Sequence, residues 1–96
     1  MMMKTYHMPI SSLALFDKFY PVTTWYGEII SQTAMDKEVN EYLAEGYSTY
    51  IEAYRALQKM KFDSFDNGIC VYNGEKWIRI KDVDYRRGII VIRDIP

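Results

Sequence analysis

The sequence of 96 residues predicts an α+β protein with an N-terminal helical half packed on a C-terminal antiparallel three-stranded β-meander. Apolar residues recur at helical spacing between residues 34 and 60, whereas residues 69–95 alternate between apolar and polar as strands do. Asn73-Gly74 separates two of these strands and is typical of a tight hairpin turn. We therefore expect a single domain over 1–96, helical over about 10–60 and a sheet over 69–95, with residues 4–8 as an optional fourth N-terminal strand.

Two short helices are expected before the main one. The first covers residues 12–20: Ser11 or Ser12 can accept a hydrogen bond from a free amide of the first turn, and Pro21 ends the helix. The second covers residues 22–30, where apolar residues at 22, 25, 26, 29 and 30 have helical spacing. The threonine and aromatic residues of this segment also favour a strand, so its assignment as a helix rests on the spacing alone.

The longest expected helix covers residues 34–60. Thr33 with Asp36 three residues later matches a capping pattern, and a broad apolar stripe follows. A straight helix of this length would extend about 40 Å at 1.5 Å per residue. A domain of this size is only about 30–35 Å across. We therefore expect either a bend at Gly46 or a helix end that contacts another molecule.

Three strands are expected at about 69–72, 75–83 and 89–95. A two-residue turn at Asn73-Gly74 would place Ile69 opposite Ile78, and a loop ending at Gly88 would place Ile80 opposite Ile92. In this register the face that lies against the helices is apolar. The other face carries Cys70, Tyr72, Trp77, Arg79 and Lys81.

Composition argues against several classes of function. The net charge of −1 provides no general attraction to nucleic acid or to an anionic membrane. One cysteine and one histidine can form neither an internal disulfide nor a Cys/His zinc site, and a single cysteine suits the reducing cytoplasm. No apolar run approaches the roughly 18–20 residues of a membrane span, and we see no signal-peptide pattern. We expect a cytoplasmic protein without cofactor, metal or membrane partner.

We expect no enzymatic activity from these residues. His7 and Cys70 could supply a base and a nucleophile, but a mid-strand thiol is more typical of a buried core residue. A serine or threonine nucleophile would need His7 or a lysine as base, and no nucleophile-elbow motif frames any serine. Paired carboxylates across a cleft stay open, but no particular pair is indicated. The acidic segment 62–68 lacks the spacing of a calcium loop, and the scattered glycines form no phosphate-binding motif. A binding protein is therefore favoured over an enzyme.

Tyrosines crowd the longest predicted helix. A phenol ring buries a large area while its hydroxyl still needs a partner or water, which is why tyrosine is enriched at interfaces. The alternative is that these rings cover the protein's own sheet. We expect a small protein-binding module that occupies a partner's surface or pairs with a second copy; its size class is that of phage-type accessory and inhibitor proteins. The candidate partner-binding residues are Tyr42, Tyr47, Tyr50, Tyr54 and Trp77.

A second hypothesis assigns the polar sheet face to single-stranded nucleic acid. Aromatic rings among cations can stack on bases and hold phosphates. Interspersed acidic residues weaken this hypothesis, as does the absence of the RNP1 pattern. The alternative is a solvated face whose tryptophan packs under a helix. The candidate nucleic-acid-binding residues are Tyr72, Trp77, Arg79, Lys81, Arg86, Arg87 and Arg93.

Overall fold

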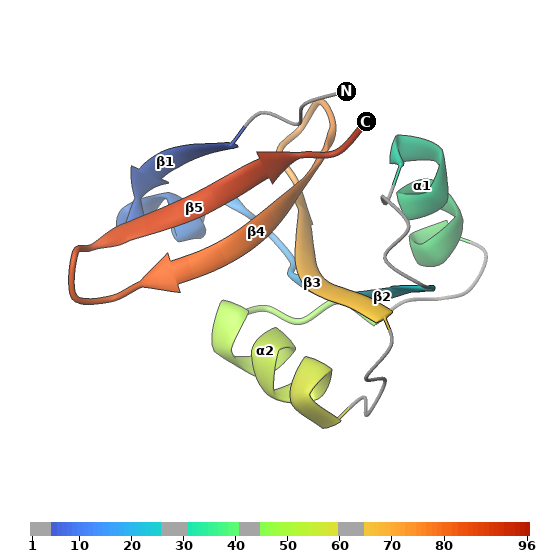
Figure 1. Ribbon diagram of the computed structural model, residues 1–96, viewed down its shortest axis with the longest axis horizontal. Coiled ribbons are helices and arrows are strands. Elements are labelled where there is room, and N and C mark those ends of the chain that lie inside the picture. The colour runs from blue at the N-terminus through green and yellow to red at the C-terminus, as the bar shows by residue number, and fades with distance from the viewer. Residues whose placement is uncertain (1–4, 26–30, 41–44, 60–64) are drawn as a thin grey trace.

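A five-stranded antiparallel sheet with the strand order β1-β5-β4-β3-β2 is the centre of the structure (Figure 1). The computed structural model describes residues 5–25, 31–40, 45–59 and 65–96. Within these ranges, three short helices accompany the sheet: the 3-10 helix η1 and the α-helices α1 and α2. The elements in chain order are β1 (Thr5–Pro9), η1 (Ile10–Leu15), β2 (Tyr20–Trp25), α1 (Gln32–Asn40), α2 (Tyr50–Lys59), β3 (Phe65–Tyr72), β4 (Trp77–Asp84) and β5 (Ile89–Asp94).

The expected helical half on a three-stranded meander is wrong, because the N-terminal half also contributes two strands to the sheet. β1 adds to β5 at one edge, where residues 4–8 were an optional strand, and β2 adds to β3 at the other edge. The segment predicted as a helix over 22–30 is a strand up to Trp25, and residues 26–30 lie outside the described residues. Its β-branched and aromatic residues pair with β3, so strand propensity with a partner outweighs helical spacing. The helix expected over 12–20 is only the 3-10 turn η1.

The long helix expected over 34–60 is replaced by two separate helices, α1 and α2. The chain is extended before α2, where Phe19 and Tyr47 exchange two backbone hydrogen bonds of 2.8 Å. Gly46 therefore lies in a bridge between segments and not inside a helix. A Cβ at Gly46 would lie 2.7 Å from Cε1 of Tyr20, so this glycine allows a close approach to that ring.

Each α-helix begins at a hydroxyl residue that the long-helix prediction did not use. Ser31 Oγ accepts a hydrogen bond of 3.0 Å from the Ala34 amide at the start of α1, so Thr33 is not the cap. Thr49 Oγ1 accepts one of 3.2 Å from the Glu52 amide at the start of α2. The Thr49 hydroxyl also donates to the Glu52 carboxylate at 2.9 Å, which makes Thr49-Tyr-Ile-Glu52 a capping pattern in its own right.

The β3–β4 hairpin turns one residue later than expected. Its turn is centred on Gly74 and Glu75, since the Asn73 amide donates to the Lys76 carbonyl and Tyr72 pairs with Trp77. Moving the turn by one residue shifts the pairing of β3 with β4 by two residues, as Ile69 now lies opposite Ile80 and not Ile78. Each side chain of the hairpin therefore keeps its predicted face of the sheet. Ile80 lies opposite Ile92 as predicted, and a bulge after Ile80 then shifts the rest of the β4–β5 pairing.

Both faces of the sheet are covered. α2 and η1 lie on one side, over the larger cluster of buried side chains, and α1 lies on the other side, over the smaller one (Figure 1). The larger cluster consists of Phe16, Phe19, Ala53, Ile69, Val71, Ile78, Ile80, Ile90 and Ile92. The smaller cluster consists of Val22, Met35, Cys70, Trp77 and Ile95.

β3 separates from β4 partway along its length. The two strands pair only over Ile69–Tyr72 with 77–80, and the earlier residues of β3 pair with β2 alone. Beyond Ile80, β4 pairs with β5 as far as the described residues show. Figure 1 shows the two strands diverging above α2. The end of β4 is thereby brought opposite the first turns of α2.

Candidate functional site

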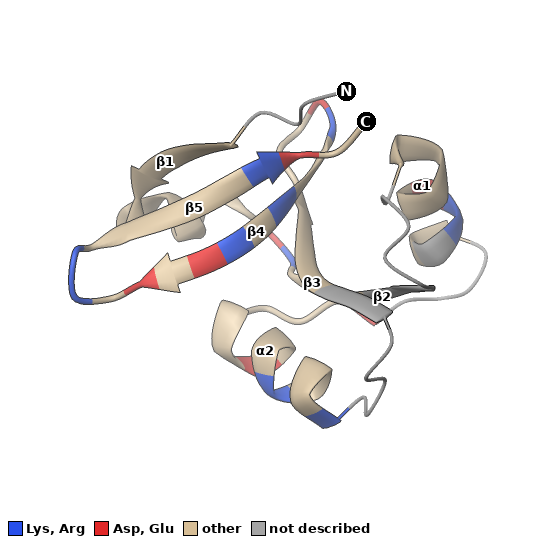
Figure 2. Ribbon diagram, in the orientation of Figure 1, with Lys and Arg blue, Asp and Glu red and all other residues tan. Residues whose placement is uncertain are grey.

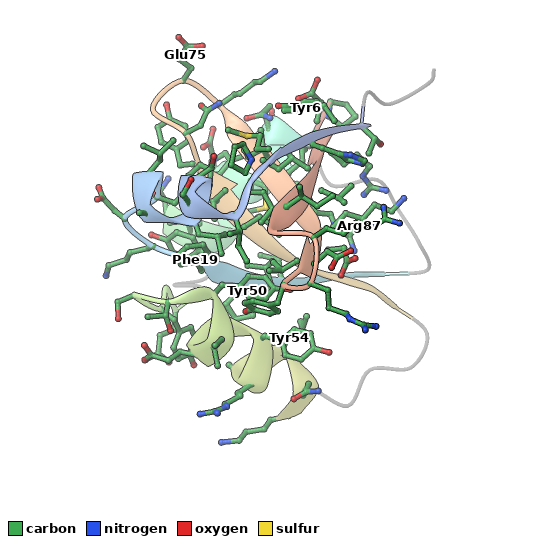
Figure 3. The ribbon with its side chains drawn as sticks, turned by 90° about the vertical axis from the view of Figure 1, so that its left-hand side faces the viewer. Tyr6, Phe19, Tyr50, Tyr54, Glu75 and Arg87 are labelled. Carbon is green, nitrogen blue, oxygen red and sulfur yellow. The ribbon has the colours of Figure 1, made fainter. Side chains whose placement is uncertain are left out.

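Two of the predicted tyrosines project from α2 toward the sheet (Figure 3). Tyr50 and Tyr54 are four residues apart, so they lie on the same face of the helix. Their rings stack with centroids 6.0 Å apart and an interplanar angle of 26°. Tyr50 also packs edge-on against Phe19 of the larger cluster, at 6.4 Å between centroids. The Tyr50 ring is thus held by the core, whereas Tyr54 is 45% exposed.

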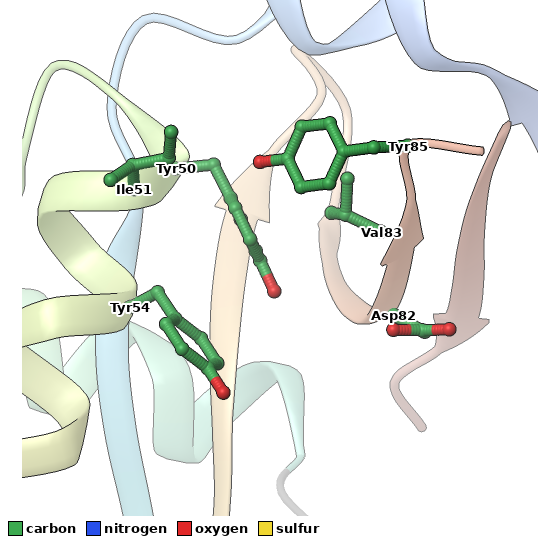
Figure 4. A pocket seen from close by; sticks show the side chains of 6 residues that line it. All are labelled: Tyr50, Ile51, Tyr54, Asp82, Val83 and Tyr85. Atoms are coloured by element: carbon green, nitrogen blue, oxygen red, sulfur yellow. The ribbon is translucent and has the colours of Figure 1, made fainter. Parts of the chain in front are cut away.

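These rings line a pocket between α2 and the end of β4. Tyr50, Ile51 and Tyr54 form one wall, and three residues of β4 and the following turn form the other (Figure 4). The volume of the pocket is about 350 Å³. The pocket exists because β3 has left β4 at this point. The second wall consists of Asp82, Val83 and Tyr85.

A second hollow of about 350 Å³ continues from the first across the start of α2. The two hollows share Tyr50, Ile51 and Tyr85, so they form one continuous depression, which we call the α2 groove. The second hollow adds side chains of η1, of the residue before β2 and of the segment before α2. The residues that it adds are Leu13, Ala14, Phe19, Ser48 and Thr49.

Large apolar side chains are exposed along the α2 groove. Ile51, Tyr54 and Tyr85 line it, and Leu15 follows the groove residue Ala14 in η1. Single exposed apolar residues are ordinary on protein surfaces, but a contiguous patch marks an interaction site. The exposed apolar side chains thus lie together at the α2 groove, with hydroxyl groups at its tyrosines.

Burial affects the ionisation of the groove's most buried phenol. The pKa of Tyr50 is raised from 10.0 to about 12, first by burial and then by charge interactions with Tyr54, Tyr85 and Asp82. Its hydroxyl, protonated at neutral pH like that of any tyrosine, can both donate and accept a hydrogen bond. Asp82 contributes a carboxylate to the same pocket.

The other predicted partner-binding residues do not line the α2 groove as far as it is described. Tyr47 packs partly against the larger cluster, and its hydroxyl lies 3.4 Å from the Glu45 carboxylate. Trp77 is buried under α1 on the opposite face, where its indole nitrogen donates to Asp36 at 3.0 Å. Tyr42 lies outside the described residues. Of the five predicted partner-binding residues, Tyr50 and Tyr54 lie together in the α2 groove.

Sequence reasoning did not select Tyr85, Asp82 or Ile51 as site residues. Tyr85 is a large aromatic residue inside an otherwise charged turn, Asp-Tyr-Arg-Arg-Gly over 84–88, and that contrast was a usable signal. The turn's position beside α2 was not visible, because it depends on the divergence of β3 from β4.

The residues of the nucleic-acid hypothesis do not form one open aromatic and basic surface. Arg79 is only 8% exposed and lies against Gly68, where a Cβ would collide with its guanidinium. Arg93 is half-buried opposite Arg79, and Trp77 is covered by α1. Lys81, Arg86 and Arg87 are exposed, and Tyr72 is partly exposed beside Trp77. Basic and acidic residues follow one another in pairs along β4 and its turn (Figure 2), with Arg87 3.7 Å from Asp84.

His7 and Cys70 are far apart. His7 lies on β1, Cys70 is fully buried on β3, and β5 and β4 lie between them. Three strand spacings separate the two residues by roughly 14 Å. In the described ranges, no group of three His, Cys, Asp or Glu residues is placed to hold a metal ion. Within the same ranges, no helix combines the length and apolarity needed to cross a bilayer.

Comparison with protein-family models, with curated proteins and with solved structures gave no match.

Proposed function

We propose that this protein is a non-enzymatic binding module that covers the surface of a partner protein with its α2 groove. The observation that carries the proposal is the exposed apolar surface of Ile51, Tyr54 and Tyr85 around one groove. Contact with a partner would remove this surface from water, which stabilises a complex by about 25 cal/mol per Å² of apolar area before the costs of association.

The fold does not need these exposed side chains for its own core. The larger cluster is built from the isoleucines of the sheet with Phe16, Phe19 and Ala53. Tyr54 and Tyr85 stand outside it, yet they lie next to Tyr50, which is anchored in it. A rigid aromatic side chain beside partly exposed ones is the arrangement of an interface hot spot, where tyrosine is enriched.

The mode of action that follows is steric. A module without cofactor or reactive machinery affects a partner by occupying its surface, as an inhibitor or accessory subunit does. The partner can be another protein or a second copy of this chain, and the cytoplasm suits a protein with one buried thiol. Light scattering of the purified chain separates these two cases before any partner is sought.

The test compares two tyrosines of nearly equal exposure on opposite sides of the sheet. Tyr54 is 45% exposed in the α2 groove, and Tyr72 is 48% exposed beside Trp77. Tyr54→Ser should lower the affinity for the partner at least about tenfold, the effect of a hot-spot residue, whereas Tyr72→Ser should leave it within about twofold. Affinity is read from self-association, or from partner retained from lysate of the producing cells, on immobilised wild-type and variant protein.

Circular dichroism of both variants provides the control for folding. If Tyr54→Ser and Tyr72→Ser lowered the affinity for the partner equally, a specific role of the groove would be contradicted. A lower affinity for Tyr72→Ser alone would contradict it as well. Absence of any association, by light scattering and by retention, would contradict the proposed function itself.

A further inference from the structure

We propose that the pocket between α2 and β4 binds one arginine side chain of the partner, with its guanidinium against the Tyr50 ring and paired with the Asp82 carboxylate. This inference rests on the proposed function and names the chemistry that the α2 groove recognises.

The first observation is the state of the Asp82 carboxylate. Asp84 accepts hydrogen bonds from the amides of Arg86 and Arg87 at 3.1 and 3.0 Å. Asp94 is paired with Lys76 at 3.3 Å and accepts from the Tyr6 hydroxyl at 3.2 Å. The Asp82 side chain makes no hydrogen bond or ion pair with any residue in the described ranges, although Asp82 lines the pocket. Among these three carboxylates of β4 and β5, it is the one that remains available to a ligand.

The second observation is the aromatic wall that faces this carboxylate. Figure 4 shows Tyr50 edge-on, with one ring face turned toward the side formed by Val83 and Asp82. The face of a phenol ring carries partial negative charge and attracts a cation within about 6 Å of its centroid. The pocket therefore offers a carboxylate and ring faces to a cation from outside.

Tyr50, Tyr54, Tyr85 and Asp82 line one pocket, so their side chains surround the same space. The pKa of the Tyr50 phenol is raised by burial, and then by Tyr54, Tyr85 and Asp82. A cation in the pocket would offset the negative charge of Asp82, so the carboxylate and the guanidinium would stabilise each other.

Arginine fits this pocket better than lysine. Its guanidinium is planar, stacks on aromatic faces and pairs with a carboxylate through two parallel N–H groups. Lys81 and Arg86 adjoin two of the lining residues in sequence and are exposed, so a densely basic segment would be repelled. The expected ligand is a single arginine within an apolar stretch, whose other side chains contact Ile51 and Tyr85.

The test uses two small probes on the full chain, N-acetylarginine methylamide and its citrulline analogue. Citrulline keeps the shape of arginine but replaces the cationic guanidinium with a neutral urea. Aromatic NMR signals of Tyr50, Tyr54 and Tyr85 should shift on titration with the arginine probe, and the citrulline probe should bind about fivefold or more weakly. Equal binding of the two probes, or an absence of shifts at these rings, would overturn the inference.

Two variants locate the effect. Asp82→Asn removes the charge of an exposed residue without changing its size, and it should abolish the preference for arginine over citrulline. Glu75→Gln makes the same change in charge at the far end of the molecule (Figure 3) and should leave the preference intact. A preference that survives Asp82→Asn, or that is lost in Glu75→Gln, would refute the assignment.

The inference and the proposed function fail in distinguishable ways. If Tyr54→Ser weakens association but Asp82→Asn leaves both association and the arginine preference unchanged, the groove binds a protein without the arginine contact. If the protein prefers the arginine probe but Tyr54→Ser leaves the affinity for the partner unchanged, the arginine pocket is supported and the proposed protein-binding function is contradicted.

Discussion

The ring of Tyr50 contacts both the core and the surface of this protein. It packs edge-on against Phe19, and it lines the α2 groove beside the more exposed ring of Tyr54. Truncating Tyr50 would therefore disturb the larger cluster as well as the groove. Tyr54 is the better residue for testing binding, because nearly half of its surface is open to solvent.

The raised pKa of Tyr50 predicts how stability changes at alkaline pH. Below its ordinary pKa of 10.0 the phenol is protonated in both the folded and the unfolded chain. Between pH 10.0 and about 12 the unfolded chain releases this proton while the folded chain keeps it, so the free energy of unfolding falls as pH rises. Tyr50→Phe should reduce this fall, measured by urea unfolding at a series of pH values. An alkaline slope as steep as that of the wild type would contradict the assignment.

Gly46 answers a question that its position in the sequence raises. A glycine between two tyrosine-rich segments suggested a bent helix, but its role is contact with another part of the chain. Tyr20 lies so close that a methyl group would have to displace its ring, which packs on Trp77 at 5.4 Å between centroids. Such a requirement depends on residues 26 positions apart, and helical spacing alone does not reveal it.

At the scale of elements, Gln32 ties α1 to the sheet. Its side-chain nitrogen donates to the carbonyls of Trp77 and Ile95 at 2.7 and 3.0 Å, and its side-chain oxygen accepts from the Trp77 amide at 2.7 Å. The amide group of the side chain thus takes the place of a peptide group beside the start of β4. This contact holds α1 over the smaller cluster, where Trp77 is covered.

α2 depends on its cap, because the chain before it is extended. Thr49→Ala should lower the free energy of unfolding by about 1 kcal/mol, since the Glu52 amide loses its hydrogen-bond acceptor. Ser48→Ala is the matched control: the Ser48 hydroxyl contacts the Glu52 carboxylate at 3.3 Å and caps no amide, so we expect less than about 0.5 kcal/mol. The free energy of unfolding of both variants is measured by denaturant unfolding, and an equal decrease in the two would refute the capping role.

The C-terminal strands were predictable because they pair with strands that are close to them in the sequence. Alternating side chains assign Ile69, Val71, Ile78 and Ile80 to one face, and a turn displaced by one residue leaves that assignment unchanged. β2 was not predictable in this way. Its residues pair with residues of β3 that lie 40 to 50 positions later, and its own pattern suits a helix as well as a strand. The Thr49 capping pattern was readable, but the continuous apolar stripe around it favoured one long helix.

At the scale of the whole molecule, the sheet divides the exposed aromatic residues between two environments. Tyr54 and Tyr85 lie along the α2 groove, while Tyr72 lies on the opposite side next to a tryptophan that α1 covers. Helical spacing could predict that Tyr50 and Tyr54 share a face. Their meeting with Asp82 and Tyr85 could not be predicted, because it arises where β3 leaves β4.

The most direct test of the binding role is cross-linking in the cells that produce the protein. A photo-reactive amino acid replaces either Ile51 in the α2 groove or Tyr72 on the opposite side, and both positions are exposed. We expect irradiation to join the chain to a partner, or to a second copy, from position 51 and not from position 72. Cross-links formed only from position 72, or from neither position, would contradict the assignment of the α2 groove as the contact surface.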